Sequence, residues 1–156
     1  MALSARFETQ MSNVDWDDDD VIERWCVSQR LFAERYLALQ PVKLGALGEW
    51  PAWHVAPFAA LWAVESVVAP GRVGWWVISG DLPTDYTSGA KTPDPRSAIA
   101  MFAGRWADLA RTVIRGEGHG ELTIGADGNS SELGPLLAAR AEVLNAWVQD
   151  DAAWET

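Results

Sequence analysis

The spacing of apolar side chains along the chain predicts three amphipathic helices. Apolar residues recur every three or four positions over residues 18–39, 95–115 and 133–149, which is the period of one helix face. Asp17 is placed to cap the first helix, with further aspartates in its first turn. Gly116 follows the second helix at the position where a helix commonly ends.

Two apolar segments between the first and second helices predict a β-hairpin. They span about residues 57–66 and 72–80, and Pro70-Gly71 between them is typical of a tight turn. Both faces of each segment are apolar, so we expect the hairpin to be covered on both sides. If the turn closes at Pro70-Gly71, facing residues have numbers that add to about 141.

Together these elements predict one α+β domain, with about three α-helices packed on a small antiparallel sheet centred on the hairpin. The domain is expected to span residues 15–150, preceded by a flexible N-terminal arm at 1–14 and followed by a C-terminal tail at 151–156. A glycine-rich connector at 116–131, with a possible short strand at 121–124, joins the last two helices.

The hairpin brings two polar, aromatic segments to one end of the sheet. GEWPAWH, residues 48–54, precedes the first strand, and GDLPTDY, residues 80–86, follows the second. The expected register places His54 near residues 85–87. We therefore predict that the candidate binding residues converge there: Glu49, Trp50, Trp53, His54, Asp81, Thr84, Asp85 and Tyr86.

This convergence has a catalytic and a structural interpretation. A histidine beside Asp81 or Asp85 can act as an oriented general base, and a neighbouring carboxylate raises the histidine pKa. The same pair can simply pin two loops together. Glu65, the single charge between His54 and Arg72, is either a poised acid, a partner of an arginine, or a strand-end glutamate that reaches solvent.

The charge balance narrows the expected partners. Twelve Lys and Arg residues against twenty-two Asp and Glu residues give a formal net charge of −10. Such a surface repels phosphate backbones and anionic lipid, so we expect neither nucleic-acid nor membrane binding. It attracts a basic protein or a cationic ligand. No apolar run has the length of a membrane helix or of a signal peptide, which favours a cytoplasmic location.

Metal and cofactor sites are not expected. Cys26 is the single cysteine and lies in the apolar stripe of the first helix, so we interpret it as a buried small hydrophobe. The chain has two histidines, His54 and His119, which are too far apart in sequence to form a short metal-binding motif.

Ten tryptophans and a run of aspartates are left with two interpretations each. Six tryptophans fall on apolar stripes of the predicted elements, where a large ring is ordinary core. Trp16, Trp50, Trp53 and Trp154 fall in loops or near the ends, where they either pack the loops down or form a binding surface. The run Asp17–Asp20 either caps the first helix or forms an acidic patch for a partner.

Three segments resemble a known family. GEWPAWHVAPF, APGRVGWWVISGDLPTDY and the segment from Pro95 to Trp106 are similar to an uncharacterised family of small bacterial proteins, a domain of unknown function. The resemblance covers roughly residues 20–154. It implies a bacterial, stand-alone, intracellular protein, and it implies no activity or catalytic residues.

These observations favour a small, acidic, non-enzymatic protein-binding module. One concrete form is an immunity or antitoxin-like inhibitor of a basic partner. The alternative is a small hydrolase-type enzyme that uses His54 with Asp81 or Asp85 in a cleft at the end of the hairpin. Neither the ligand nor the oligomeric state is specified by the sequence.

Overall fold

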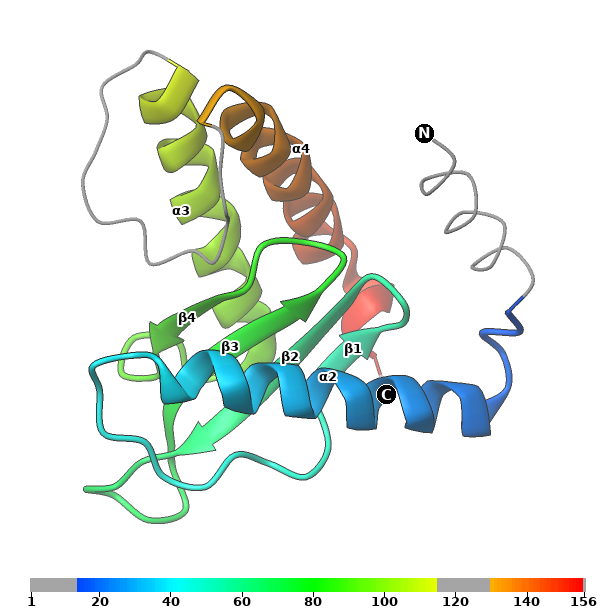
Figure 1. Cartoon of the computed structure of the whole chain (residues 1–156), viewed down its shortest axis with the longest axis vertical. Coiled ribbons are helices and arrows are strands. Elements are labelled where there is room, and N and C mark those ends of the chain that lie inside the picture. The colour runs from blue at the N-terminus through cyan, green and yellow to red at the C-terminus, as the bar shows by residue number, and fades with distance from the viewer. Residues whose placement is uncertain (1–13, 115–129, 156) are drawn as a thin grey trace.

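The chain folds into a single α+β domain, as predicted (Figure 1). A computed structural model describes residues 14–114 and 130–155. In chain order the elements are α2 (Asp19–Ala38), β1 (Trp53–Val55), β2 (Ala59–Glu65), β3 (Val73–Gly80), β4 (Asp85–Ser88), α3 (Pro95–Ile114), α4 (Ser130–Gln149) and the short 3-10 helix η1 (Asp151–Trp154).

The three predicted helices are confirmed, with small shifts at their ends. Asp18, one residue after the predicted cap, accepts a hydrogen bond from the backbone N–H of Asp20 and starts α2. α4 starts three residues earlier than predicted and continues through Pro135. Pro135 is the sixth residue of α4, where it lacks the N–H that would bond to the carbonyl four residues earlier. Among the described helices, none combines the length and apolarity needed to cross a membrane.

The predicted hairpin is the centre of a four-stranded antiparallel sheet with the order β1-β2-β3-β4. Leu61 pairs with Ile78 and Ala63 with Trp76, so facing numbers add to 139, two less than predicted. The flanking strands β1 and β4 were not predicted, because three and four residues are too few for an alternating pattern to show. The possible strand at 121–124 and arm residues 1–13 lie outside the described residues.

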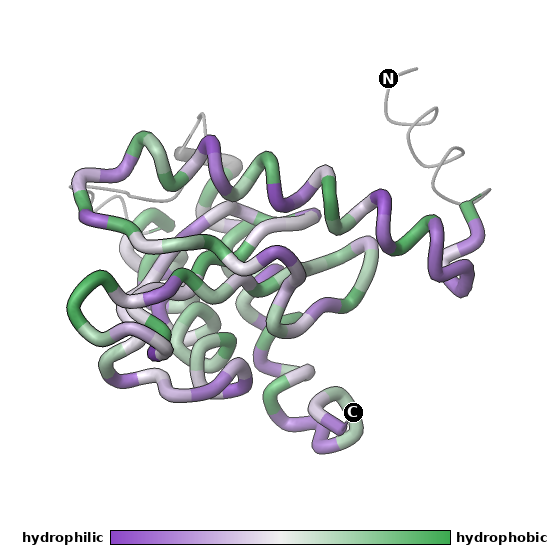
Figure 2. The backbone as a smooth tube through the Cα atoms, turned by 90° about the horizontal axis from the view of Figure 1, so that it is seen from below, coloured by the Kyte–Doolittle hydropathy of each residue, from purple (hydrophilic) through white to green (hydrophobic). Residues whose placement is uncertain are grey.

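The sheet separates two apolar layers, as the two-sided pattern of the hairpin predicted. α3 and α4 cover one face, and α2 is the one described helix that crosses the other (Figure 1). Trp106 of α3 and Trp62 of β2 are fully buried in the first and second layers. The tube of α2 alternates between hydrophobic and hydrophilic colours along its length, as expected of a helix with one buried side (Figure 2).

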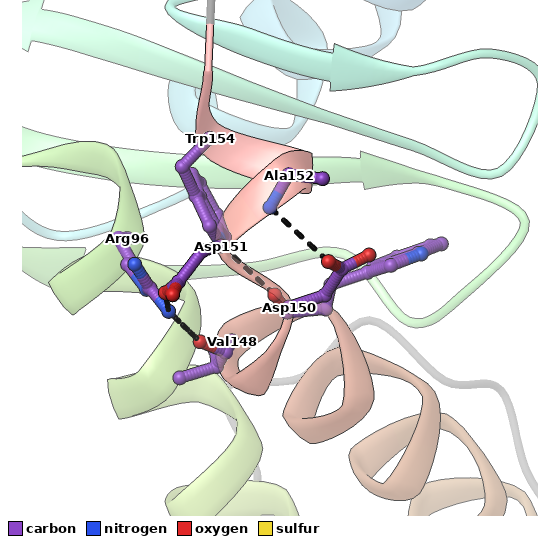
Figure 3. A network of polar contacts seen from close by, with 7 residues as sticks. Arg96, Val148, Asp150, Asp151, Ala152 and Trp154 are labelled. Atoms are coloured by element: carbon purple, nitrogen blue, oxygen red, sulfur yellow. Dashed lines mark hydrogen bonds and ion pairs between the residues drawn. The ribbon is translucent and has the colours of Figure 1, made fainter.

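The C-terminal residues, expected as a tail, include η1 and are held against α3 and α4 by polar contacts (Figure 3). The Arg96 guanidinium donates to the Val148 carbonyl at 2.6 and 2.9 Å and to Asp151 at 2.8 Å. It thereby satisfies a carbonyl in the last turn of α4, which lacks a helical partner. Asp150 caps η1 by accepting from the Ala152 N–H.

Candidate functional site

The strand register separates the two residues on which the sequence-based site depended. His54 lies on β1 and pairs with Ala60, whereas Asp85 lies on β4 and pairs with Ile78. Two strands lie between them, which sets a separation of about 14 Å. The prediction that they meet was wrong. The chain reverses at residues 56–58, so His54 pairs back onto β2 and cannot pair across the hairpin.

Asp85 is instead the buried anchor of β4 on α3. Its side chain is 0% exposed. Its carboxylate accepts from Trp106 Nε1 at 2.9 Å and from Arg105 at 3.1 Å, and the Tyr86 N–H donates to its other oxygen at 2.8 Å. Arg105 also donates to the Tyr86 carbonyl and the Thr87 hydroxyl, both at 2.8 Å.

Burial dominates the electrostatics of this anchor. Desolvation raises the pKa of Asp85, and the Arg105 guanidinium and hydrogen bonds from Trp106 and Tyr86 oppose that rise. Burial, and then the charge of Asp85, raise the pKa of the Tyr36 hydroxyl. The arrangement is an ion pair between a fully buried carboxylate and a partly exposed arginine, and it fixes an edge strand. Sequence reasoning missed Arg105 as its partner, although a cation next to the buried Trp106 is a signal that a carboxylate lies near.

The other residues of the GDLPTDY segment are divided between the interior and the surface. Thr84 is buried, and Tyr86 packs against Tyr36 with ring centroids 6.0 Å apart. Asp81 is exposed and lies 3.7 Å from Arg140. These two side chains line a pocket of about 260 Å³ together with Phe58, Leu82, Val143 and Trp147.

Trp53 faces the C-terminal end of the chain. Its indole N–H donates to the Ala153 carbonyl at 3.0 Å, and its ring stacks on Trp154 with centroids 4.5 Å apart. Trp147 completes the contact at 5.6 Å. Trp53 and Trp154 therefore pack the C-terminal residues against the sheet, which is the first of the two interpretations given for the loop tryptophans.

The two remaining loop tryptophans form a row of rings with His54 and with one tryptophan of α2. We call this the ring row: Trp16, Trp25, His54 and Trp50. Successive ring centroids are 6.4, 6.5 and 6.3 Å apart. The first and last contacts are edge-to-face, with interplanar angles of 85° and 83°. The row crosses from the N-terminal end of α2 to the sheet edge, and Trp50 at its end is 46% exposed.

His54 is the polar member of the ring row, and its environment is apolar. Burial lowers the pKa of His54, which corrects the expectation that a carboxylate would raise it. Its Nδ1 atom is buried and has no hydrogen-bond partner in the described part of the chain. His54 is therefore neutral at neutral pH.

Carboxylates flank the ring row at both ends. Asp15 and Asp17–Asp20 are all exposed next to Trp16, and Glu49 is exposed next to Trp50. Capping and an acidic surface coexist here, because within residues 14–114 and 130–155 the side chains of Asp15 and Asp18 accept a backbone N–H and those of the other three aspartates do not. The ring row is thus an aromatic surface in a field of negative charge.

Two further residues singled out from the sequence, Glu65 and Cys26, show no sign of a catalytic or metal-binding role in the described residues. Glu65 is exposed at the end of β2, as the strand-end interpretation has it. Cys26 is 1% exposed, and burial raises the pKa of its thiol to about 11. Over residues 14–114 and 130–155, no three His, Cys, Asp or Glu side chains are grouped so that they could hold a metal ion.

Comparison with known proteins identifies a family but no function. Neither the curated proteins nor the solved structures contain a match to this chain. A family model does match it, over residues 19–154, and so spans every described helix and strand. The chain therefore belongs to the family described as Domain of unknown function (DUF4826).

Proposed function

We propose that this chain is a small, non-enzymatic protein-binding module whose ring row docks a basic segment of a partner protein. The observation that carries the proposal is the ring row itself, a run of three tryptophans and a neutral histidine flanked by exposed carboxylates. Tryptophan faces attract ammonium and guanidinium groups, and they contribute strongly to protein interfaces.

Electrostatics support a basic partner. The chain carries a formal net charge of −10, and five exposed aspartates lie beside Trp16. Negative potential of this kind speeds the encounter with a positively charged partner. The neutral state of His54 supports the same partner, because an imidazolium in the row would repel a lysine or arginine side chain. An immunity or antitoxin-like inhibitor is one protein class with this behaviour.

The hydrolase alternative has no observation in its favour. It requires His54 to face Asp81 or Asp85, but Asp81 pairs with Arg140 and Asp85 with Arg105. Within the described residues, the His54 Nδ1 atom donates no hydrogen bond to either carboxylate.

The test is binding of a short synthetic peptide of alternating lysine and glycine, measured by calorimetry and by NMR of the indole N–H resonances. We expect saturable binding that shifts the Trp50 resonance and weakens at least tenfold in Trp50→Ala. Asp17→Asn with Asp19→Asn should also weaken binding, because the variant lacks two of the carboxylates beside Trp16. Neither side chain caps α2, so the helix should be retained.

The matched control removes two carboxylates elsewhere. Glu142→Gln with Glu155→Gln lowers the negative charge by the same amount on the exposed surface of α4 and the C-terminal residues. If this variant loses as much affinity as the aspartate variant, binding is a net-charge effect and the ring row is not the site. Binding that leaves every ring-row resonance unshifted refutes the proposal in the same way.

A further inference from the structure

A second surface, at the far end of α2 from the aspartates, has the opposite charge. The turn between β2 and β3 and the loop after β4 enclose a groove of about 850 Å³. Among the residues that the structure describes, its charged lining residues are Lys43 and Arg72, and no carboxylate lines it. The nearest acidic residue along the hairpin, Glu65, lies outside the lining.

Two positively charged side chains of the groove lining have no ion-pair partner among the described residues. They are Lys43 and Arg72; Lys91, the other lysine of the chain, lines a different pocket beside α3. Within the described ranges, neither lysine nor Arg72 takes part in an ion pair, whereas Arg30, Arg96, Arg105, Arg111 and Arg140 all do. The cations of the groove are therefore available to a ligand.

The walls of the groove are apolar. Val42, Val73 and Trp75 line it, and the β2–β3 turn contributes Val67 and Val68, which are 53% and 88% exposed. The turn projects from the body of the domain in Figure 1 and is a strongly hydrophobic loop at the left edge of Figure 2. A volume of this size is within the range of small-molecule sites, roughly 300–1,000 Å³.

We propose that this hairpin groove binds a small amphiphilic anion, a carboxylate or phosphate group on a short apolar body. Lys43 and Arg72 would hold the anionic group, and the valines and Trp75 would cover the apolar part. This site is separate from the ring row and takes a ligand of the opposite charge, so either proposal can fail without the other.

The charge distribution favours a small anion over an extended anionic surface. The aspartates at the start of α2 lie about 30 Å from its C-terminal end, since each helical residue rises 1.5 Å. At that distance their repulsion is screened at ordinary salt, where the Debye length is about 10 Å. A bilayer or a nucleic acid would extend toward the negatively charged remainder of the protein and be repelled.

The experiment titrates the full chain with octanoate and octyl phosphate below their micelle concentrations and follows backbone amide resonances. We expect saturable shifts confined to residues 42–43, 66–75 and 88–93. Acetate and inorganic phosphate lack the apolar body, and octyltrimethylammonium lacks the negative charge; all three should bind at least tenfold more weakly. Lys43→Ala with Arg72→Ala should reduce octanoate affinity at least tenfold.

A matched control removes two exposed cations of α2 that form no ion pair with any described residue. Arg24→Ala with Arg35→Ala changes the net charge equally and should alter octanoate affinity less than threefold. Equal losses in the two double variants, equal binding of acetate and octanoate, or the absence of saturable shifts would overturn the proposal. So would binding to phosphatidylglycerol vesicles without binding to free octanoate, because the ligand would then be a membrane surface.

Discussion

Replacing Arg105 with alanine tests whether the Asp85 anchor holds β4 on α3. In the folded protein the Asp85 carboxylate is fully buried, and Arg105 is the cation beside it at 3.1 Å. The substitution leaves that carboxylate in the interior with hydrogen bonds from Trp106 and Tyr86 and no counter-charge.

The expected loss of stability follows from these contacts. Removing one partner of a buried ion pair costs about 3–5 kcal/mol. The Arg105 side chain is 32% exposed, so water replaces part of its effect, but two further hydrogen bonds are lost to the Tyr86 carbonyl and the Thr87 hydroxyl. We expect Arg105→Ala to lower the free energy of unfolding by about 3 kcal/mol at neutral pH.

Urea denaturation followed by circular dichroism measures this change, and a double-mutant cycle identifies its cause. In an Asp85→Asn background the same substitution should cost only about 1 kcal/mol, because no charge is stranded. A loss below about 1 kcal/mol in the Asp85 protein, or equal losses in both backgrounds, would refute the reasoning.

The pH dependence of the same variant is a second measurement. Burial raises the folded pKa of Asp85 above its unfolded value of about 3.9, so the cost of its charge is present above the folded pKa and absent below the unfolded one. Without Arg105 the folded pKa rises further. The destabilisation by Arg105→Ala should therefore shrink as the pH is lowered through the folded pKa of Asp85 in the variant.

Three further predictions concern His54, Cys26 and two glycines. NMR titration should give His54 a pKa below about 6.5, and a higher value would contradict its burial. The contribution of His54 to folding stability is then complete above its unfolded pKa and is lost as the pH falls through its folded pKa. Cys26 should react with a thiol reagent only after denaturation, and rapid labelling of the native protein would show that α2 is not packed as described. Gly80→Ala should destabilise by about 2 kcal/mol or more, because φ is +137° and a Cβ atom would lie 2.3 Å from the Phe58 carbonyl oxygen. Gly104→Ala, where nothing lies within 4 Å, should instead stabilise α3 by about 0.5–1 kcal/mol, and equal effects of the two glycine substitutions on urea unfolding would contradict this backbone argument.

Long periodic segments were predictable from the sequence, and short pairings were not. The three helices and the two strands of the hairpin are long enough for their buried positions to show as a periodic pattern of apolar residues. β1 has three residues and β4 has four, and both are specified by contacts with β2 and β3. Those two strands decide where His54 and Asp85 point. Missing them therefore left the fold class intact and misplaced the site.

The ring row could not be predicted from the sequence either. Trp16 and Trp50 were recognised as tryptophans outside the predicted elements, but their meeting through Trp25 and His54 depends on how α2 crosses the sheet. No local pattern fixes that crossing. The acidic flank, by contrast, could be read directly from the sequence, because the charges are contiguous along the chain.

Among the described helices, α2 is the one that covers its face of the sheet, which makes it the natural unit of partial opening. It buries Cys26, Ala33 and Leu37, and Arg30 ties it to the carbonyls of Leu47 and Gly48. Its amides should therefore exchange with solvent at a lower free energy than those of α3 and α4, which pack on each other. A ligand of the ring row spans α2 and the sheet edge, so binding would slow this exchange and protect the loop between α2 and β1 from proteases.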